Sequence, residues 1–332
     1  MPLDSDLRLN VTKFEPQRIS QQTSSFNEQL MRVMAQGPRW WEVGAPKYRQ
    51  MRWNGETPMP RPAVLASAQD ITLPSRDPGR QIPCRLFRPA DGTVGGLFYH
   101  IHGGGWVLQS EHYQDTMLQH WADRAHMIVL SVGYRLAPEH PYPAGNEDCL
   151  DVAEHLVDRG KSSFGVPLKF MGGDSAGGHL SVLTCFHLLS SRPNFAFHGL
   201  ILNFGAYDLS GFLPQTWNFR KAEPLILDVE IMQHFIAAYL PGKSVEQRRD
   251  WRISPFFADL KSMKLPPALF TCGSEDCLLD DSVMMCARWM ASGASAVLKV
   301  YPGAPHGFVG FPPSGTEQTQ RAWDDIVSFL SE

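Results

Sequence analysis

The stretch LKFMGGDSAGG at residues 168–178 decides the fold of this chain. Its apolar start predicts a short buried strand, and residues 176–189 after it are typical of a helix. A G-x-S-x-G pattern on such a strand-to-helix turn needs small residues around Ser175, because the serine backbone is strained and its side chain must stand clear. The helix also directs its first amides and positive dipole end toward Ser175. This setting favours a reactive serine over a glycine-rich helix start without chemistry.

Strands and helices alternate on both sides of this stretch. Short apolar runs predict strands, and amphipathic runs between them predict helices. The pair at residues 71–73 and 82–87 alternates like two antiparallel strands around turn residues. Such alternation predicts an α/β fold with a mostly parallel central sheet and helices on both faces. The expected strands are 96–101, 127–132, 168–171, 200–204, 268–271 and 297–300, and the expected helices are 117–125, 146–159, 176–189, 282–291 and one around 323–330 that follows a capping signal at Ser314-x-x-Glu317.

Two segments depart from this rhythm. Residues 1–65 lack strand alternation and carry apolar residues near helical spacing, which predicts an N-terminal helical cap segment. Residues 209–255 show no strand and contain one clear helical pattern at 228–240, with Trp217 and Phe219 before it. We therefore expect a catalytic domain over residues 66–332 with a helical cap inserted at about 209–255.

Composition excludes several classes of protein. The chain has 332 residues, 43% of them hydrophobic and 19% charged, so it is not a disordered chain. A net charge of −4 argues against a nucleic-acid partner. No basic region followed by an apolar run and no run of membrane-spanning length is visible, so we expect a soluble cytoplasmic protein without a membrane span. The six cysteines lack C-x-x-C spacing, so no metal site is expected.

A second motif follows the strand that ends at residue 101. His102 is followed by Gly103, Gly104, Gly105 and Trp106. Three glycines after a strand let the backbone turn and expose unpaired N–H groups, which a developing oxyanion needs. A phosphate-binding loop is the alternative, but no P-loop or dinucleotide-binding pattern is present, and this also excludes a dinucleotide-dependent oxidoreductase.

Two further loops lie after predicted strands. Residues 273–281 contain three aspartates and one glutamate that compete for one role, and His306 lies in the tight loop PGAPHGF at 302–308. Loops at the carboxyl ends of parallel strands converge on one crevice. The chain order is therefore a glycine-rich amide loop, a serine, an acid and a histidine, which is the order found in α/β-hydrolases.

The chain resembles the hormone-sensitive lipase-like branch of the α/β-hydrolase fold. The matching residues are 102–106, the run YRLAPEHPYPA at 134–144, residues 173–178, the segment 276–281 and His306-Gly307-Phe308. These matches span about residue 68 to the C-terminus. The resemblance implies that Asp276, which opens the D-x-L-x-D segment, is the catalytic acid, although Cys277 stands where relatives often have Pro or Val.

The resemblance and the motif positions together imply a serine esterase mechanism that needs no metal or organic cofactor. Ser175 attacks an ester carbonyl, His306 transfers the proton, and Asp276 orients the imidazole. Amides of Gly103, Gly104, Gly105 and Ala176 form the oxyanion hole. Asp174 is interpreted as structural, although it is also a candidate for the substrate pocket together with Trp106 and Phe308.

The substrate class follows less directly. Aromatic residues in the expected cap predict an apolar pocket for short- to medium-chain acyl esters or an ester of a hydrophobic metabolite. An amidase, arylformamidase or lactonase with the same triad stays open, and a small-molecule receptor of the same family is the alternative from another class. The expected partner is a small-molecule ester, and a homodimer also stays open because relatives often dimerise through edge strands.

Overall fold

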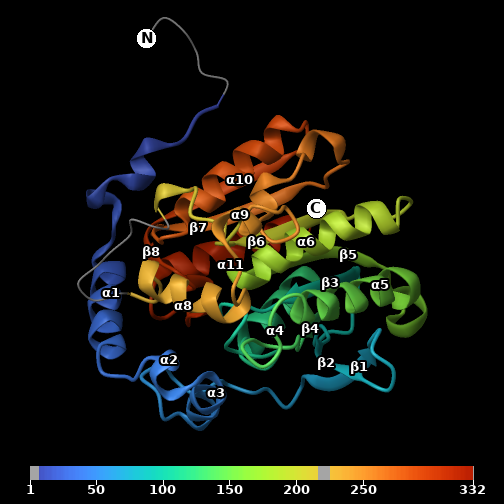
Figure 1. Cartoon of the computed structure of the whole chain (residues 1–332), viewed down its shortest axis with the longest axis horizontal. Coiled ribbons are helices and arrows are strands. Elements are labelled where there is room, and N and C mark those ends of the chain that lie inside the picture. Colours follow the sequence, from blue (N-terminus) through green and yellow to red (C-terminus); the bar gives the residue numbers. More distant parts are fainter. Residues whose placement is uncertain (1–6, 216–224, 332) are drawn as a thin grey trace, which may run out of the picture.

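A computed structural model describes residues 7–215 and 225–331 (Figure 1). Its centre is an eight-stranded sheet with the strand order β1-β2-β4-β3-β5-β6-β7-β8. β2 runs antiparallel to both β1 and β4, and all strands from β3 to β8 are parallel. This arrangement confirms the predicted mostly parallel α/β sheet. The strands are β1 Gln69–Pro74, β2 Gln81–Phe87, β3 Gly96–Ile101, β4 Met127–Val132, β5 Leu168–Asp174, β6 Gly199–Asn203, β7 Ala268–Glu275 and β8 Ala296–Pro305.

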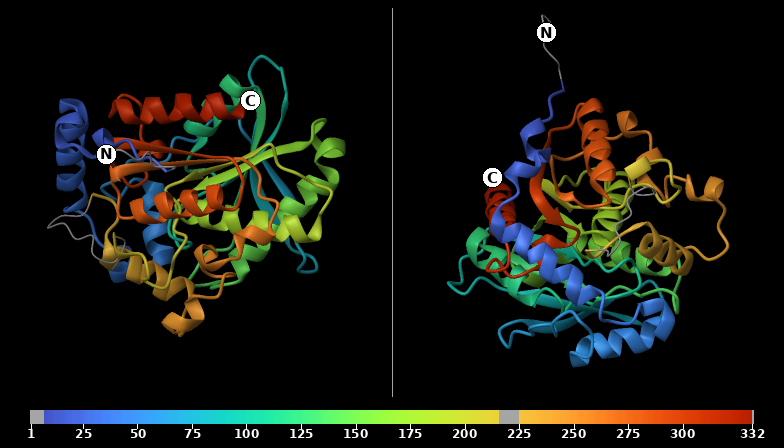
Figure 2. Two further views of the ribbon diagram at one scale, coloured as in Figure 1. Left: turned by 90° about the horizontal axis from the view of Figure 1, so that it is seen from above. Right: turned by 90° about the vertical axis from the view of Figure 1, so that its left-hand side faces the viewer.

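Helices cover both faces of the sheet, as Figure 2 shows from above. Side chains of β3 alternate between the two faces: Leu97, Tyr99 and Ile101 join one core, while Phe98 joins the other. Because both faces are covered, all six residues of β3 are buried. The first core is covered by α5 Ala144–Phe164, α6 Ala176–Ser191 and α10 Leu279–Ala291, and the second by α4 Asp115–Ala125 and α11 Glu317–Leu330.

Two helical segments outside the sheet meet in space. Trp40 stacks on Phe235 at a ring-centroid distance of 5.3 Å, and Trp41 stacks on His234 at 4.0 Å. These pairs join the N-terminal segment to the segment between β6 and β7. The N-terminal helices are α1 Gln21–Met34, α2 Trp40–Val43 and α3 Ala45–Asn54, and those of the second segment are α8 Val229–Tyr239 and α9 Val245–Arg248. The part of the predicted insertion at 216–224, with Trp217 and Phe219, lies outside the described residues.

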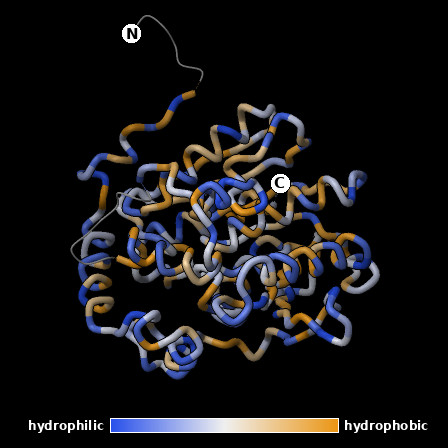
Figure 3. The backbone as a smooth tube through the Cα atoms, viewed as in Figure 1, coloured by the Kyte–Doolittle hydropathy of each residue, from blue (hydrophilic) through white to orange (hydrophobic). Residues whose placement is uncertain are grey.

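Helix α1 is fastened to the C-terminal part of the chain. The Thr23 and Thr316 hydroxyls are hydrogen-bonded at 2.9 Å, and the Asn27 amide donates to the Gly303 carbonyl at 2.8 Å. Thr316 is also the N-cap of α11, so the predicted cap at Ser314 is wrong. Helix α3, in the same N-terminal segment, carries mostly hydrophilic residues (Figure 3). Side-chain hydrogen bonds therefore tie α1 to the C-terminal part of the chain.

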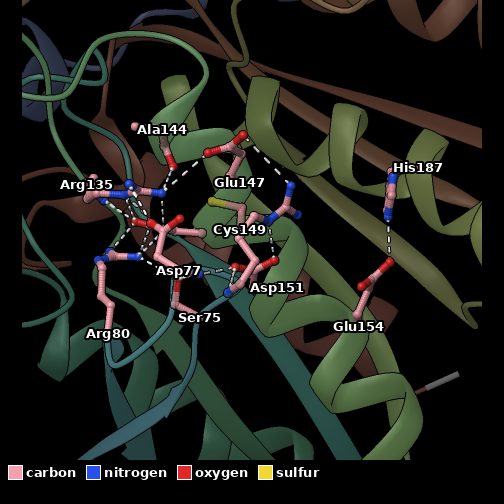
Figure 4. A network of polar contacts seen from close by, with 12 residues as sticks. Ser75, Asp77, Arg80, Arg135, Ala144, Glu147, Cys149, Asp151, Glu154 and His187 are labelled. Atoms are coloured by element: carbon pink, nitrogen blue, oxygen red, sulfur yellow. Dashed lines mark hydrogen bonds and ion pairs between the residues drawn. The ribbon is translucent and has the colours of Figure 1, made fainter.

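The segment 134–144 is held by a partly buried ion-pair network around Asp148, drawn in part in Figure 4. Arg80 donates two hydrogen bonds to the carboxylate of Asp148, at 2.6 and 2.7 Å, and Arg135 binds the same carboxylate. The backbone N–H of Arg135 also donates to Asp148 at 2.8 Å. The Tyr134 hydroxyl in turn donates to the His102 carbonyl at 3.0 Å. The network therefore links the β1–β2 turn and α5 to the loop after β3.

Short 3-10 turns complete the described chain. They are η1 Val11–Phe14, η2 Pro16–Arg18, η3 Pro255–Phe257, η4 Leu260–Ser262 and η5 Phe308–Gly310. Within the described ranges, no helix combines the length and the apolar character needed to cross a lipid bilayer.

Candidate active site

Ser175 occupies the sharp turn between β5 and α6. Its backbone has φ 57° and ψ −117°, a region that L-residues rarely adopt. The flanking glycines are required by contact rather than by their own φ angles. A Cβ on Gly173 would lie 2.2 Å from the Ile101 carbonyl oxygen, and one on Gly177 would lie 1.9 Å from the same atom. The turn therefore packs directly on the end of β3, which pushes the Ser175 side chain outward.

His306 and Asp276 complete a hydrogen-bonded chain with Ser175. The Ser175 hydroxyl lies 2.9 Å from Nε2 of His306, and Nδ1 of His306 lies 2.9 and 3.0 Å from the two carboxylate oxygens of Asp276. Asp276 is fully buried, and it accepts a further hydrogen bond from the Leu278 amide at 2.9 Å. These contacts suit a tautomer in which Nδ1 carries the proton and Nε2 accepts from the serine.

The glycine-rich loop lies directly against the serine. A Cβ on Gly103 would lie 2.7 Å from the Asp174 carbonyl oxygen and 3.4 Å from Cβ of Ser175. Gly104 and Gly105 have φ of 98° and 61°, so the loop turns back on itself. Within the described residues, no acceptor binds the amides of Gly104, Gly105 and Ala176. These N–H groups therefore remain available as hydrogen-bond donors in the loop that packs against Ser175 and at the start of α6.

The His102 side chain contacts the backbone of this loop, and its imidazole stays neutral. Its ring stacks on Tyr134 at 4.2 Å, and its Nδ1–H donates to the Gly103 carbonyl at 2.8 Å. Burial lowers the pKa of His102 to about 3. A neutral ring that holds the loop backbone cannot serve as a proton carrier at neutral pH.

Asp174 lines the cavity but is fully committed to hydrogen bonds. Its carboxylate accepts from His100 at 3.0 Å, from Gln114 at 2.6 Å and from Asn203 at 2.7 Å. Burial alone raises the pKa of this carboxyl, but the three donors bring the pKa below its ordinary value. Asp174 therefore remains an acceptor that fixes the serine turn between β3, α4 and β6.

Trp106 reaches the cavity while most of its ring packs in the core. The indole is 2% exposed, stacks on Tyr239 at 4.6 Å and donates from Nε1 to Nδ1 of His179 at 3.1 Å. His179 donates from Nε2 to the Ile253 carbonyl at 2.7 Å, and burial lowers its pKa to about 4. Trp106 thus connects the loop after β3 to helices α6 and α8.

The cavity in front of Ser175 has a volume of about 420 Å³. Its walls come from the N-terminal segment, the loop after β3 and helix α8, and they are mostly apolar, with Trp40, Trp41, Ile231, Met232 and Phe235 among them. Phe308 is not one of the lining residues, which corrects the prediction. Gly307 has φ 74° and turns the chain, so that Phe308 is fully buried. The centroid of its ring lies 5.0 Å from that of Tyr301 and 5.8 Å from that of Phe204.

The sequence analysis missed a group of polar residues in this cavity. Arg39, Tyr48, Arg49 and Arg52 from the N-terminal segment line it, together with Tyr113. No motif marks them, because they reach the site only through the packing of α2 and α3 over the sheet. Scattered apolar residues near helical spacing were the only signal in residues 1–65. Among the described residues, no group of three His, Cys, Asp or Glu side chains could hold a metal ion.

Comparisons with known proteins agree with this architecture. A sequence profile of the α/β hydrolase fold matches residues 98–310. Carboxylic ester hydrolase LipN of Mycobacterium tuberculosis is 31% identical over 257 residues, which are 76% of this chain and 66% of LipN. Carboxylesterase NlhH of the same organism is 34% identical, and the match covers 72% of this chain and 76% of NlhH.

A solved structure gives the same result. The hyperthermophilic esterase from the archaeon Pyrobaculum calidifontis superimposes with a TM-score of 0.80 at 28% identity, over 94% of this chain and 98% of that esterase. The sheet order, the profile match and these relatives confirm the resemblance found in the sequence. The chain therefore belongs to the α/β-hydrolase fold family, in its branch of carboxylic ester hydrolases.

Proposed function

We propose that this protein is a serine carboxylesterase in which Ser175, His306 and Asp276 form the catalytic triad. The observation that carries the proposal is the unbroken chain of hydrogen bonds from the Ser175 hydroxyl through His306 to the buried Asp276 carboxylate. That chain opens into an apolar cavity and faces amides that have no acceptor among the described residues. An ester carbonyl placed between the serine and these amides meets a nucleophile on one side and donors on the other.

The reaction then follows from the roles of these groups. The Ser175 Oγ attacks the ester carbonyl carbon while Nε2 of His306 takes its proton. The oxyanion is held by the amides of Gly104, Gly105 and Ala176, with Gly103 as a further donor. His306 next protonates the leaving alcohol, and water cleaves the acyl-enzyme by the same proton transfers in reverse. Asp276 keeps the imidazole in the required tautomer and stabilises its charged form.

The substrate class is set by the cap. We assign residues 1–65 and about 209–255 as its two parts, because the described residues of both segments line the cavity. A cavity of about 420 Å³ with mostly apolar walls suits esters with short to medium acyl chains or a compact hydrophobic alcohol. Burial of such a chain stabilises the complex by ~0.8 kcal/mol per methylene group.

The test is hydrolysis of p-nitrophenyl esters from two to sixteen carbons by the wild type and by Ser175→Ala. A rate that depends on Ser175 and peaks at short to medium chains supports the proposal. Matched amides and lactones in the same panel identify the bond that is cleaved. If the folded wild type shows no Ser175-dependent rate and no labelling of Ser175 by a fluorophosphonate, the protein is a binding protein and the proposal is wrong.

A further inference from the structure

Arg52 is a cation that the ester mechanism leaves without a role. It lies in α3 and lines the same cavity as Ser175. Its guanidinium is half-buried and lies 5.7 Å from the centre of the Tyr113 ring. Within the described ranges, its only hydrogen bond goes to the Pro60 carbonyl, and no carboxylate forms an ion pair with it. A guanidinium carries five N–H donors, so most of them remain available.

Three other arginines are paired with buried carboxylates. Arg85 pairs with Asp115 at 2.6 Å, and Arg80 and Arg135 share the buried Asp148. Even Arg49, which also lines the cavity, binds Glu139 and donates to the Val107 carbonyl at 2.8 Å. Desolvating a cation without a partner is costly, so an unpaired guanidinium in a mostly apolar cavity requires a different explanation.

Arg288 shows what a purely structural arginine looks like in this chain. It also lacks a carboxylate partner among the described residues, but it donates to the carbonyls of Phe256 and Ala258 and lies over the Phe256 ring. Those contacts are with backbone groups and a ring that α10 packs against. Arg52 instead faces a cavity that contains a reactive serine.

The surroundings of Arg52 are positive. Arg39 lines the same cavity. Burial raises the pKa of the Tyr48 phenol, and the positive charges of Arg52 and Arg39 oppose this rise. Among the described residues of the cavity wall, Asp174 is the only one with a carboxylate, and it already accepts three hydrogen bonds from its neighbours. Two tyrosine hydroxyls, of Tyr48 and Tyr113, lie in the same wall and can donate to an anion. This corner of the cavity therefore offers a planar cation and neutral donors, which together match a carboxylate.

We propose that Arg52 selects esters that carry a carboxylate, which binds the guanidinium while the ester carbonyl lies at Ser175. The inference rests on the proposed esterase function and adds its substrate class. The apolar walls hold the hydrocarbon part between the two polar ends. A charge-assisted hydrogen bond in a half-buried site strengthens binding of the acidic substrate over its neutral analogue by ~10-fold or more.

The experiment compares p-nitrophenyl monoesters of dicarboxylic acids having four to eight carbons with p-nitrophenyl alkanoates of the same chain length. A second arm uses the butyrate ester of a hydroxy acid and its methyl ester, which places the carboxylate on the alcohol side. The quantity measured is the ratio of kcat/KM for the acidic ester to kcat/KM for the neutral ester. The wild-type ratio is expected above one at an optimal chain length in one of the two arms, and to fall as salt is added.

Arg52→Gln is expected to lower this ratio ~10-fold or more, mainly through KM, and Arg52→Lys to retain part of it. Arg124→Gln removes the same charge from an exposed position at the end of α4 and should leave the ratio unchanged. A wild-type ratio at or below one in both arms overturns the inference. So does an equal loss on both substrates in Arg52→Gln, which would make Arg52 structural. If the wild type hydrolyses none of these esters in a Ser175-dependent way, the result contradicts the proposed function itself.

Discussion

At the scale of single residues, the two glycine motifs of this chain depend on one another. Gly173 and Gly177 both face the Ile101 carbonyl, which belongs to the strand that leads into the glycine-rich loop. Gly103 in that loop faces Asp174 and Ser175 in return. Each motif therefore has glycine at these positions because the other motif packs directly against it. A side chain larger than hydrogen at any of these three positions separates the serine from the amides.

Asp276→Asn tests the assignment of the triad acid. An asparagine donates to Nδ1 of His306, so Nε2 would carry the proton and could no longer accept from Ser175. We expect kcat to fall roughly 10⁴-fold with little change in KM. The measurement is steady-state hydrolysis of the best p-nitrophenyl ester.

Asp280→Asn is the matched control, because Asp280 lies in the first turn of α10, close to Asp276 in the sequence. Among the described residues, it accepts a hydrogen bond from the Gln215 backbone N–H at 3.0 Å. It should keep kcat within a few-fold of the wild type. A large loss in Asp280→Asn together with an active Asp276→Asn would move the acid to the later aspartate.

Gly105→Ala tests the amide loop. Gly105 has φ 61°, and a Cβ there would lie 2.4 Å from the Phe235 ring. The added methyl group must displace the loop or the ring, so we expect kcat to fall 10²- to 10³-fold, as for loss of one oxyanion donor. Gly92→Ala is the control, since Gly92 has φ 75° with open space around its Cβ position.

Both variants share the cost of a positive φ, about 1 kcal/mol in the free energy of unfolding. Urea unfolding measures that cost, and ester hydrolysis measures the loss specific to the loop. If Gly105→Ala keeps full activity, the loop accommodates a side chain at this position, and the close packing of Gly105 on Phe235 is not required for hydrolysis.

At the scale of elements, strand and helix patterns could be predicted because burial on both faces leaves continuous apolar runs. Each strand expected between residues 96 and 300 forms in the structure, although β7 and β8 continue past their expected ends to Glu275 and Pro305. The pattern failed where a single turn decides the outcome. Phe308 looks like a pocket residue beside His306, but the turn at Gly307 sends it into the core. Ser314 looks like a helix cap, but Thr316 occupies that position.

The cavity wall could not be predicted, for a different reason. Arg52 and Tyr48 lie more than 120 positions from Ser175 in the sequence, and no periodicity or spacing relates them to the serine. Their position depends on how α2 and α3 dock, through pairs such as Trp40 with Phe235. Such docking is a property of tertiary packing, whereas the triad loops are positioned by the sheet itself.

Asp148→Asn tests the ion-pair network that anchors the segment 134–144. The Asp148 side chain is fully buried and binds Arg80, Arg135 and the Arg135 backbone amide. Removing its charge leaves two guanidinium groups partly unpaired, so we expect a loss of ~3–5 kcal/mol in the free energy of unfolding. Urea unfolding at pH 7 gives the value.

Asp77→Asn is the control within the same network, because the Asp77 side chain is 44% exposed and pairs with Arg135 at 3.0 Å. A change of no more than ~1 kcal/mol is expected there. Equal losses in both variants would show that burial of Asp148 does not set the strength of the network.

At the scale of the whole molecule, the fold depends on imidazoles that stay neutral inside it. Burial lowers the pKa of His102 to about 3 and that of His179 to about 4, both below the ordinary value of 6.5. Both rings form hydrogen bonds near the site. His102 donates to the Gly103 carbonyl in the glycine-rich loop, and His179 accepts from Trp106 and donates to the Ile253 carbonyl. Protonation of His179 at Nδ1 would break the hydrogen bond from Trp106, which positions the loop after β3. Protonation of His102 would keep the Nδ1–H bond to Gly103 but would place an unpaired charge in a buried site.

The sign of that dependence follows from the direction of the pKa shifts. Above pH 6.5 each ring is neutral in both the folded and the unfolded chain, and neither favours unfolding. Below pH 6.5 the unfolded chain binds protons that the folded chain does not, so each ring lowers the free energy of unfolding by about 1.4 kcal/mol per pH unit. For His179 this loss continues to about pH 4, where the folded protein also takes up the proton.

His179→Gln removes one of these titrating groups. We expect its free energy of unfolding to fall less steeply between pH 6.5 and 4 than that of the wild type, whatever its value at pH 7. Urea unfolding of both proteins at four or five pH values measures the slope. Parallel curves for wild type and His179→Gln would mean that His179 is protonated in the folded protein. In that case the hydrogen bond from Trp106 could not form, and the loop after β3 would need another anchor.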